Sequence, residues 1–134
     1  GNGKLIKEHG GYYIGQFKNI LPNGRGIEYD KNGNIIYDGD LIDGKAEGNG
    51  KLIYKNGDYY IGQFKNGLKN GKGMIYKKNR NILYEGEFKD SKAEGYGKYY
   101  DINGECYIGQ FKNNLKKGIG LLYDKSGYII WGRI

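Results

Sequence analysis

Apolar and polar residues alternate along this chain in short runs that are separated by glycines. The run Tyr60–Lys65 (Tyr-Ile-Gly-Gln-Phe-Lys) is representative, because period-two alternation places its Tyr, Gly and Phe on one face of an extended strand. A loop follows at residues 66–70, and a second run of strand type follows at 71–76. No segment of useful length has a helical period. The pattern therefore predicts β-hairpins along the whole chain.

The hairpin pattern repeats. The motif Tyr-Ile-Gly-Gln-Phe-Lys-Asn begins at Tyr13, Tyr60 and Tyr107, a spacing of 47 residues. A related motif begins at Tyr37 and Tyr84, so the basic period is 23 or 24 residues. Repeats of this length are single supersecondary units that bury their apolar faces against their neighbours. The chain is therefore predicted to be a linear array of hairpins.

The expected fold is all-β: an extended, single-sheet antiparallel β-meander of eleven strands, twisted and curved. Asn-Gly pairs such as Asn32-Gly33 and Asn56-Gly57 lie where hairpin turns are expected. A Gly-x-Gly in each repeat is expected to leave room for aromatic rings to lie on the backbone. The single domain 1–134 divides into a partial repeat, five repeats and a degenerate terminal stub: 1–12, then 13–36, 37–59, 60–83, 84–106 and 107–130, then 131–134.

These motifs resemble the MORN (membrane occupation and recognition nexus) repeat family, whose pattern is Tyr-x-Gly-x-Trp/Phe, a short loop, Gly-x-Gly and a turn. Three positions depart from it: Leu41 replaces the aromatic residue of the second copy, Arg80 stands where the other turns of its type have glycine, and Arg133 occupies a glycine position. The resemblance implies a curved sheet with a binding role near membranes or the cytoskeleton. It also implies docking of protein segments, helical ones included, and frequent dimerisation.

Residues suited to catalysis or metal binding are scarce. The chain has one cysteine, Cys106, which aligns with the strand residue Tyr59, and one histidine, His9, which aligns with the turn residue Asn56. Nucleophilic catalysis needs a nucleophile beside a base, and a structural zinc site needs several such ligands. We therefore expect no enzyme activity, no cofactor, no metal and no small-molecule substrate.

Paired carboxylates recur with the 47-residue period, on one face of their strands. A pair of this kind can carry out acid–base chemistry. Recurrence indicates architecture instead, with cross-strand pairing to the bases Arg25 and Lys72 on neighbouring strands. The pairs are Asp38/Asp40 and Glu85/Glu87.

The net charge of +7 is unevenly distributed, and its sign alternates from repeat to repeat. Repeat 60–83 carries six bases and no acid, which suits an anionic lipid headgroup. Acidic repeats on either side weaken that hypothesis, and the tyrosines hold consensus positions that the fold itself needs, so no nucleic-acid partner is expected. The candidate anion- and lipid-binding residues are Lys65, Lys69, Lys72, Lys77, Lys78 and Arg80.

We expect a cytoplasmic location, with membrane or cytoskeleton as candidate sites of association, and three functional hypotheses follow. The first is a protein-interaction scaffold that binds a partner segment along its aromatic face, the second is an anionic-phospholipid module, and the third is a regulatory array of a larger enzyme. Unpaired strand edges also predict a homodimer, with the apolar end 128–131 as the contact. The candidate partner-binding residues, which also have a packing role, are Tyr13, Phe17, Tyr37, Tyr60, Phe64, Tyr84, Phe88, Tyr107 and Phe111.

Overall fold

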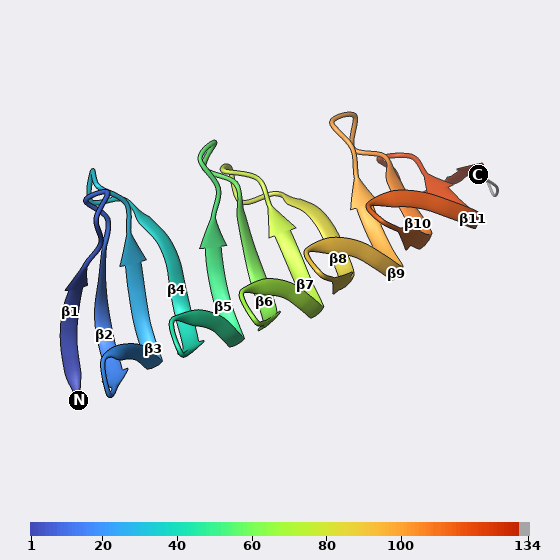
Figure 1. The fold of residues 1–134 in the computed structure, drawn as a ribbon. Coiled ribbons are helices and arrows are strands. Elements are labelled where there is room, and N and C mark those ends of the chain that lie inside the picture. The colour runs from blue at the N-terminus through green and yellow to red at the C-terminus, as the bar shows by residue number, and fades with distance from the viewer. Residues whose placement is uncertain (132–134) are drawn as a thin grey trace.

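The computed structural model describes residues 1–131 as one antiparallel sheet whose strands lie side by side in sequence order. The ribbon is elongated, with the N-terminal strand at one end and the last strands at the other (Figure 1). The strands are β1 (Asn2–Ile6), β2 (Tyr12–Lys18), β3 (Leu21–Tyr29), β4 (Ile35–Ile42), β5 (Lys45–Ile53), β6 (Tyr59–Lys65), β7 (Leu68–Tyr76), β8 (Ile82–Lys89), β9 (Lys92–Tyr100), β10 (Cys106–Lys112), β11 (Leu115–Tyr123) and β12 (Ile129–Trp131).

The predicted fold class is confirmed, and the sheet has twelve strands where eleven were expected. The additional strand is β12, which pairs with β11 through Leu122 opposite Trp131 and Tyr123 opposite Ile129. Trp131, the first residue of the predicted terminal stub 131–134, ends β12, and the rest of the stub, with Arg133 in a glycine position, lies outside the described residues.

The two ends of the hairpins use different turns. At one end, two-residue turns such as Asp43-Gly44 and Asn66-Gly67 have positive φ at both central positions, which is the type I′ geometry. The loop predicted at 66–70 is therefore a two-residue turn, and β7 already begins at Leu68.

The predicted turn pairs Asn32-Gly33 and Asn56-Gly57 lie at the other end of the hairpins, in three-residue turns. The Gly33 N–H donates to the Asp30 carbonyl (3.0 Å) and the Asp30 N–H to the Asn34 carbonyl (2.8 Å), with Gly33 at φ 85°. This is a type I turn followed by a left-handed residue. These pairs mark hairpin turns as predicted, and their turn class differs from the type I′ turns at the opposite end of the hairpins.

Each long strand bends at a bulge where the first glycine of Gly-x-Gly stands. Gly71, at φ 90°, lies where the β6–β7 register shifts between Gly62 and Phe64. The Gln63 side chain fills the gap, because its Oε1 accepts a hydrogen bond from the Lys72 N–H at 2.9 Å. This first glycine thus allows the strand to bend at the bulge, whereas the sequence pattern predicted that both glycines make room for aromatic rings.

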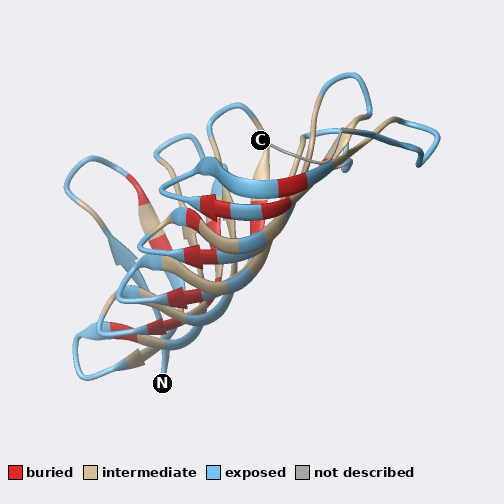
Figure 2. Ribbon diagram, turned by 90° about the vertical axis from the view of Figure 1, so that its right-hand side faces the viewer, coloured by how far each residue is buried: buried red, intermediate tan, exposed pale blue. Residues whose placement is uncertain are grey.

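The bend creates an inner face, and the core lies along it. Lys69 precedes the bulge of β7, yet its Nζ donates to the hydroxyl of Tyr54, beyond the opposite end of β5, at 2.7 Å. That contact requires the two arms of the sheet to fold toward each other. Figure 2 shows the buried residues as segments that repeat from strand to strand along the array.

Candidate functional site

The tyrosine that opens each motif folds back over the glycine two residues later. The Tyr60 hydroxyl donates to the Gln63 carbonyl at 2.7 Å, and the equivalent bond recurs in all five copies. A Cβ on Gly62 would lie 2.5 Å from that hydroxyl, and one on Gly73 would lie inside contact distance of the ring. Glycine is therefore required at both places because the ring lies directly on the backbone.

The aromatic side chains form a ladder along the inner face that is interrupted at Leu41. Phe88 packs edge to face against Tyr60 and Tyr84, with both centroids at 5.1 Å, and so links two repeats. Phe64 and Phe111 make the same double contact. Burial raises the pKa of Tyr60 and of Tyr84 to about 12. The ladder is the core of the protein.

The predicted partner-binding residues are the members of this ladder. Eight of the nine are no more than 6% exposed, and Phe17 alone is partly exposed. Their main role is packing, so a partner on the inner face would contact them only where neighbouring side chains leave the rings uncovered. Those placed on this face are Tyr13, Phe17, Tyr37, Tyr60, Phe64, Tyr84, Phe88, Tyr107 and Phe111.

The ladder borders a hollow of about 290 Å³ over β7–β10. Tyr84, Phe88 and Phe111 contribute to its lining, together with Ile75 and Tyr99. Sequence reasoning missed these last two, although period-two alternation from Gly73 already places Ile75 on the face of the rings. Leu83 and Ala93 complete its apolar lining, and Ser91 and Asn114 are polar.

Lys69 lines this hollow from the part of β7 that precedes the bulge at Gly71. Its Nζ lies 5.1 Å from the Phe88 ring centroid, 5.3 Å from that of Tyr54 and 5.5 Å from that of Tyr60. Burial lowers the pKa of Lys69. The hollow thus presents a partly desolvated cation beside aromatic rings, an arrangement that attracts a carboxylate.

The six predicted anion-binding residues do not gather in one patch. Lys65 lies at the tight-turn end of β6, whereas Lys77, Lys78 and Arg80 lie beyond the opposite end of β7. The strand between them separates the two groups along its length. Lys69 faces inward, and Lys72 alternates with the inward-facing Gly73, so it lies on the outer face.

His9 and Cys106 have the structural environments expected of them. The imidazole Nδ1 of His9 accepts a hydrogen bond from the Gly11 N–H at 3.2 Å, as the Asn56 side chain does from Asp58 in the equivalent turn. Burial raises the pKa of the Cys106 thiol, which disfavours the reactive thiolate. Within residues 1–131, no group of three His, Cys, Asp or Glu side chains could hold a metal ion. No helix in this part of the chain is long and apolar enough to cross a membrane.

The predicted cross-strand charge pairing is present at the first of the two carboxylate pairs, Asp38/Asp40. Arg25 bridges Asp38 (3.5 Å) and Asp40 (3.8 Å). At the second pair, Glu85/Glu87, Lys72 stands opposite Glu87 in the β7–β8 register, without an ion pair to it.

The comparisons with known proteins agree with this geometry. No curated protein matches the chain. The model of the MORN repeat matches five consecutive segments, at residues 13–35, 37–59, 60–82, 84–106 and 107–127. MORN repeats are modules of protein and membrane interaction and are not an enzyme family. Each matched segment opens at a Tyr-x-Gly motif of the ladder, and together they cover most of the chain, which therefore belongs to the MORN repeat family.

Proposed function

We propose that this protein is a non-catalytic interaction module that binds a segment of a partner protein along its inner face. The observation that supports this most directly is the inner hollow, where Tyr84, Phe88 and Phe111 are not fully covered by the protein's own side chains. Exposed apolar concavities on a rigid scaffold are typical sites of recognition.

The lining defines the chemistry of the partner. Ile75, Leu83 and Tyr99 offer apolar contacts, and Lys69 offers a cation whose bonded partner is a neutral tyrosine hydroxyl. The bound segment is therefore apolar and carries a carboxylate that reaches Lys69. A charge-assisted hydrogen bond of this kind is stronger than a neutral one, particularly where water is partly excluded.

Peptide selection tests this proposal. A displayed library of random peptides is selected on the immobilised protein, and the enriched peptides are titrated against variants by fluorescence anisotropy. Leu83→Asp places a charge in the hollow and is expected to weaken binding about tenfold or more. The control Ile102→Asp changes an apolar side chain that is 89% exposed, in the turn between β9 and β10, and should leave affinity unchanged. Equal affinities for the two variants would refute the inner-face site.

The carboxylate is tested separately with Lys69→Gln. This variant should weaken the binding of acidic peptides and leave neutral analogues unaffected. Loss of both classes alike would show that Lys69 only maintains the fold.

The anionic-lipid alternative is tested by flotation of phosphatidylserine or phosphoinositide vesicles against neutral ones, at low and physiological salt. Because the six bases are dispersed, binding to anionic vesicles should fade at physiological salt, where exposed charges are screened. Strong binding there, lost on neutralising those bases, would favour the lipid function instead.

A second copy of the chain is also proposed as a partner. Tyr128, Ile129 and Ile130 are 73%, 60% and 47% exposed at the last strand. Light scattering at high micromolar concentration should show a dimer, and a monomer there would refute this contact.

A further inference from the structure

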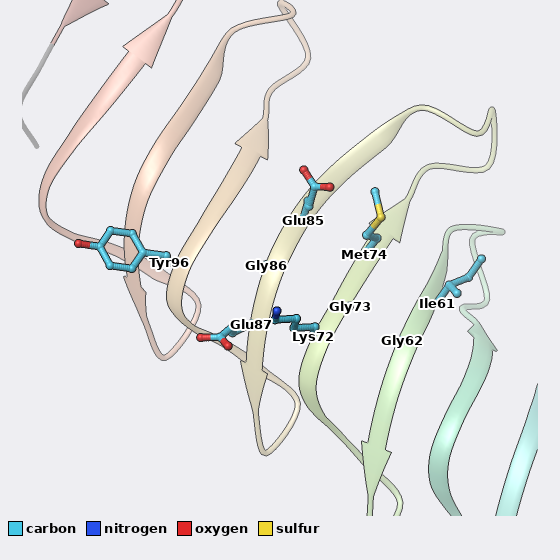
Figure 3. Close-up of a pocket in the computed structure, with 9 residues that line it drawn as sticks. All are labelled: Ile61, Gly62, Lys72, Gly73, Met74, Glu85, Gly86, Glu87 and Tyr96. Atoms are coloured by element: carbon cyan, nitrogen blue, oxygen red, sulfur yellow. The ribbon is translucent and has the colours of Figure 1, made fainter.

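The outer face of the sheet, opposite the aromatic ladder, carries a second hollow of about 510 Å³ over β6–β9. Figure 3 shows Ile61 on β6, Lys72 and Met74 on β7, Glu85 and Glu87 on β8, and Tyr96 on β9 around it. Three glycines complete its lining and expose the backbone between these side chains: Gly62, Gly73 and Gly86.

This hollow combines an apolar floor with two carboxylates. Ile61 and Met74 are register partners across β6 and β7, and Met74 is the register partner of Glu85. Neither Glu85 nor Glu87 forms an ion pair with a basic side chain of residues 1–131. Tyr96 is 68% exposed at the edge of the hollow.

The equivalent place 47 residues earlier shows what such a pair of carboxylates accepts. There the guanidinium of Arg25 lies 3.5 Å from Asp38 and 3.8 Å from Asp40 and bridges them. Arg25 has the register position opposite Asp40 that Lys72 has opposite Glu87. The chain thus supplies its own arginine to the pair Asp38/Asp40, whereas the residue beside Glu85/Glu87 is a lysine that forms no ion pair with them.

We infer that the outer hollow binds an arginine side chain of a partner protein. The guanidinium bridges Glu85 and Glu87 as Arg25 bridges Asp38 and Asp40, and the methylene stem lies over Ile61 and Met74. A planar guanidinium suits this place because it offers several N–H donors to two acceptors at once, whereas an ammonium is a compact point charge.

This site is independent of the inner hollow, because the two lie on opposite faces of the sheet and share no lining residue. A partner that wraps around the ribbon could use both, but each is tested alone.

Met74 is the only methionine in the chain, so a 13C-methyl label on methionine reports from inside this hollow with a single resonance. The probe is Nα-acetyl-arginine amide, titrated in parallel with the citrulline and lysine analogues. The expected result is a saturable shift of the Met74 methyl with the arginine probe. The neutral citrulline analogue should give no saturable shift, and the lysine analogue should bind several-fold more weakly.

Variants locate the bound cation. Glu85→Gln/Glu87→Gln should abolish the shift. The matched pair Asp38→Asn/Asp40→Asn should leave it intact, because the probe does not bind at Asp38 and Asp40. Lys72→Arg should form with Glu85 and Glu87 the bridge that Arg25 forms with Asp38 and Asp40. It should therefore block the probe while preserving the fold, as monitored by the amide spectrum. Persistence of the shift without Glu85 and Glu87, equal shifts with citrulline, or equal affinity for lysine would each overturn the assignment.

Discussion

Replacement of Gly73 by alanine tests whether the tyrosine ring truly rests on the backbone. The added Cβ would fall inside contact distance of the Cε1, Cζ and Oη atoms of Tyr60. The backbone of Gly73 is held in the β6–β7 and β7–β8 pairings, opposite Gly62 and Gly86. We therefore expect the ring, and not the strand, to move.

The cost follows from the contacts that Tyr60 makes. Its ring meets Phe64 and Phe88 edge to face at 5.1 Å, and each such pair contributes about 0.5–1.5 kcal/mol beyond burial. Its hydroxyl donates to the Gln63 carbonyl, a bond worth about 1 kcal/mol net. Together these losses amount to roughly 2–4 kcal/mol, before the lost burial of a fully buried ring is counted. A domain is stable by only about 5–15 kcal/mol, so Gly73→Ala should be severely destabilising.

Urea unfolding followed by circular dichroism measures this loss. Gly118→Ala is the matched control, because Gly118 has φ 72° but no atom within 4 Å of its added Cβ. It should cost only the backbone strain of about 1–2 kcal/mol. Hydrogen exchange should show faster exchange in β6–β8 and little change in β1–β3, since each repeat contacts mainly its neighbours. Equal losses in the two variants would refute the steric argument.

Three further changes have directions that the structure fixes. Leu41→Phe supplies the missing ring between the first two tyrosines of the ladder and should stabilise the fold by about 1–2 kcal/mol in urea unfolding; a loss of stability would show that the second copy cannot accept the ring. Arg80, at φ 76° where the other turns of its type have glycine, should gain about 1 kcal/mol on Arg80→Gly, since the left-handed strain is removed, and an unchanged melting temperature would contradict this. Alkaline pH should destabilise the protein: burial holds the pKa of Tyr60 and Tyr84 at about 12 against 10.0 for an ordinary tyrosine, so the unfolded chain loses these protons first. Stability is then full below pH 10 and falls as the pH rises toward 12, by up to about 1.4 kcal/mol per unit and group. Urea midpoints at pH 9 and pH 11 measure the fall, which should be shallower in Tyr60→Phe/Tyr84→Phe; the same slope in that variant would exclude these tyrosines as its source.

Sequence periodicity predicted the sheet because the same alternation recurs in every copy. Tyr60, Gly62 and Phe64 do share a face, and the second glycine of Gly-x-Gly does lie under a ring. The first glycine could not be assigned in this way. Alternation assumes a regular strand, and Gly71 breaks that regularity at a bulge with positive φ.

The sites were harder to predict because they depend on the bend. Lys65 and Arg80 are fifteen positions apart in a basic repeat, but β7 runs between them and puts them at opposite ends of the strands. Lys69 contacts Tyr54 only because the strands bend at their bulges, which brings the start of β7 toward the residue that follows β5. The contrast between Arg25 and Lys72 was visible in the sequence, whereas the open hollow beside Lys72 required the geometry.

The single break in the aromatic ladder also has a mechanical consequence. Phe64, Phe88 and Phe111 each clasp two successive tyrosines, but Leu41 has no ring with which to link the first two. Under bending or tension along its length, the ribbon should yield first at the junction of β3 and β4, where no phenylalanine links the two repeats and the exposed ion pairs of Arg25 with Asp38 and Asp40 add little. The portion from Tyr37 onward would then move as a stiff body, and the N-terminal hairpins would pivot on it as a short, softer lever.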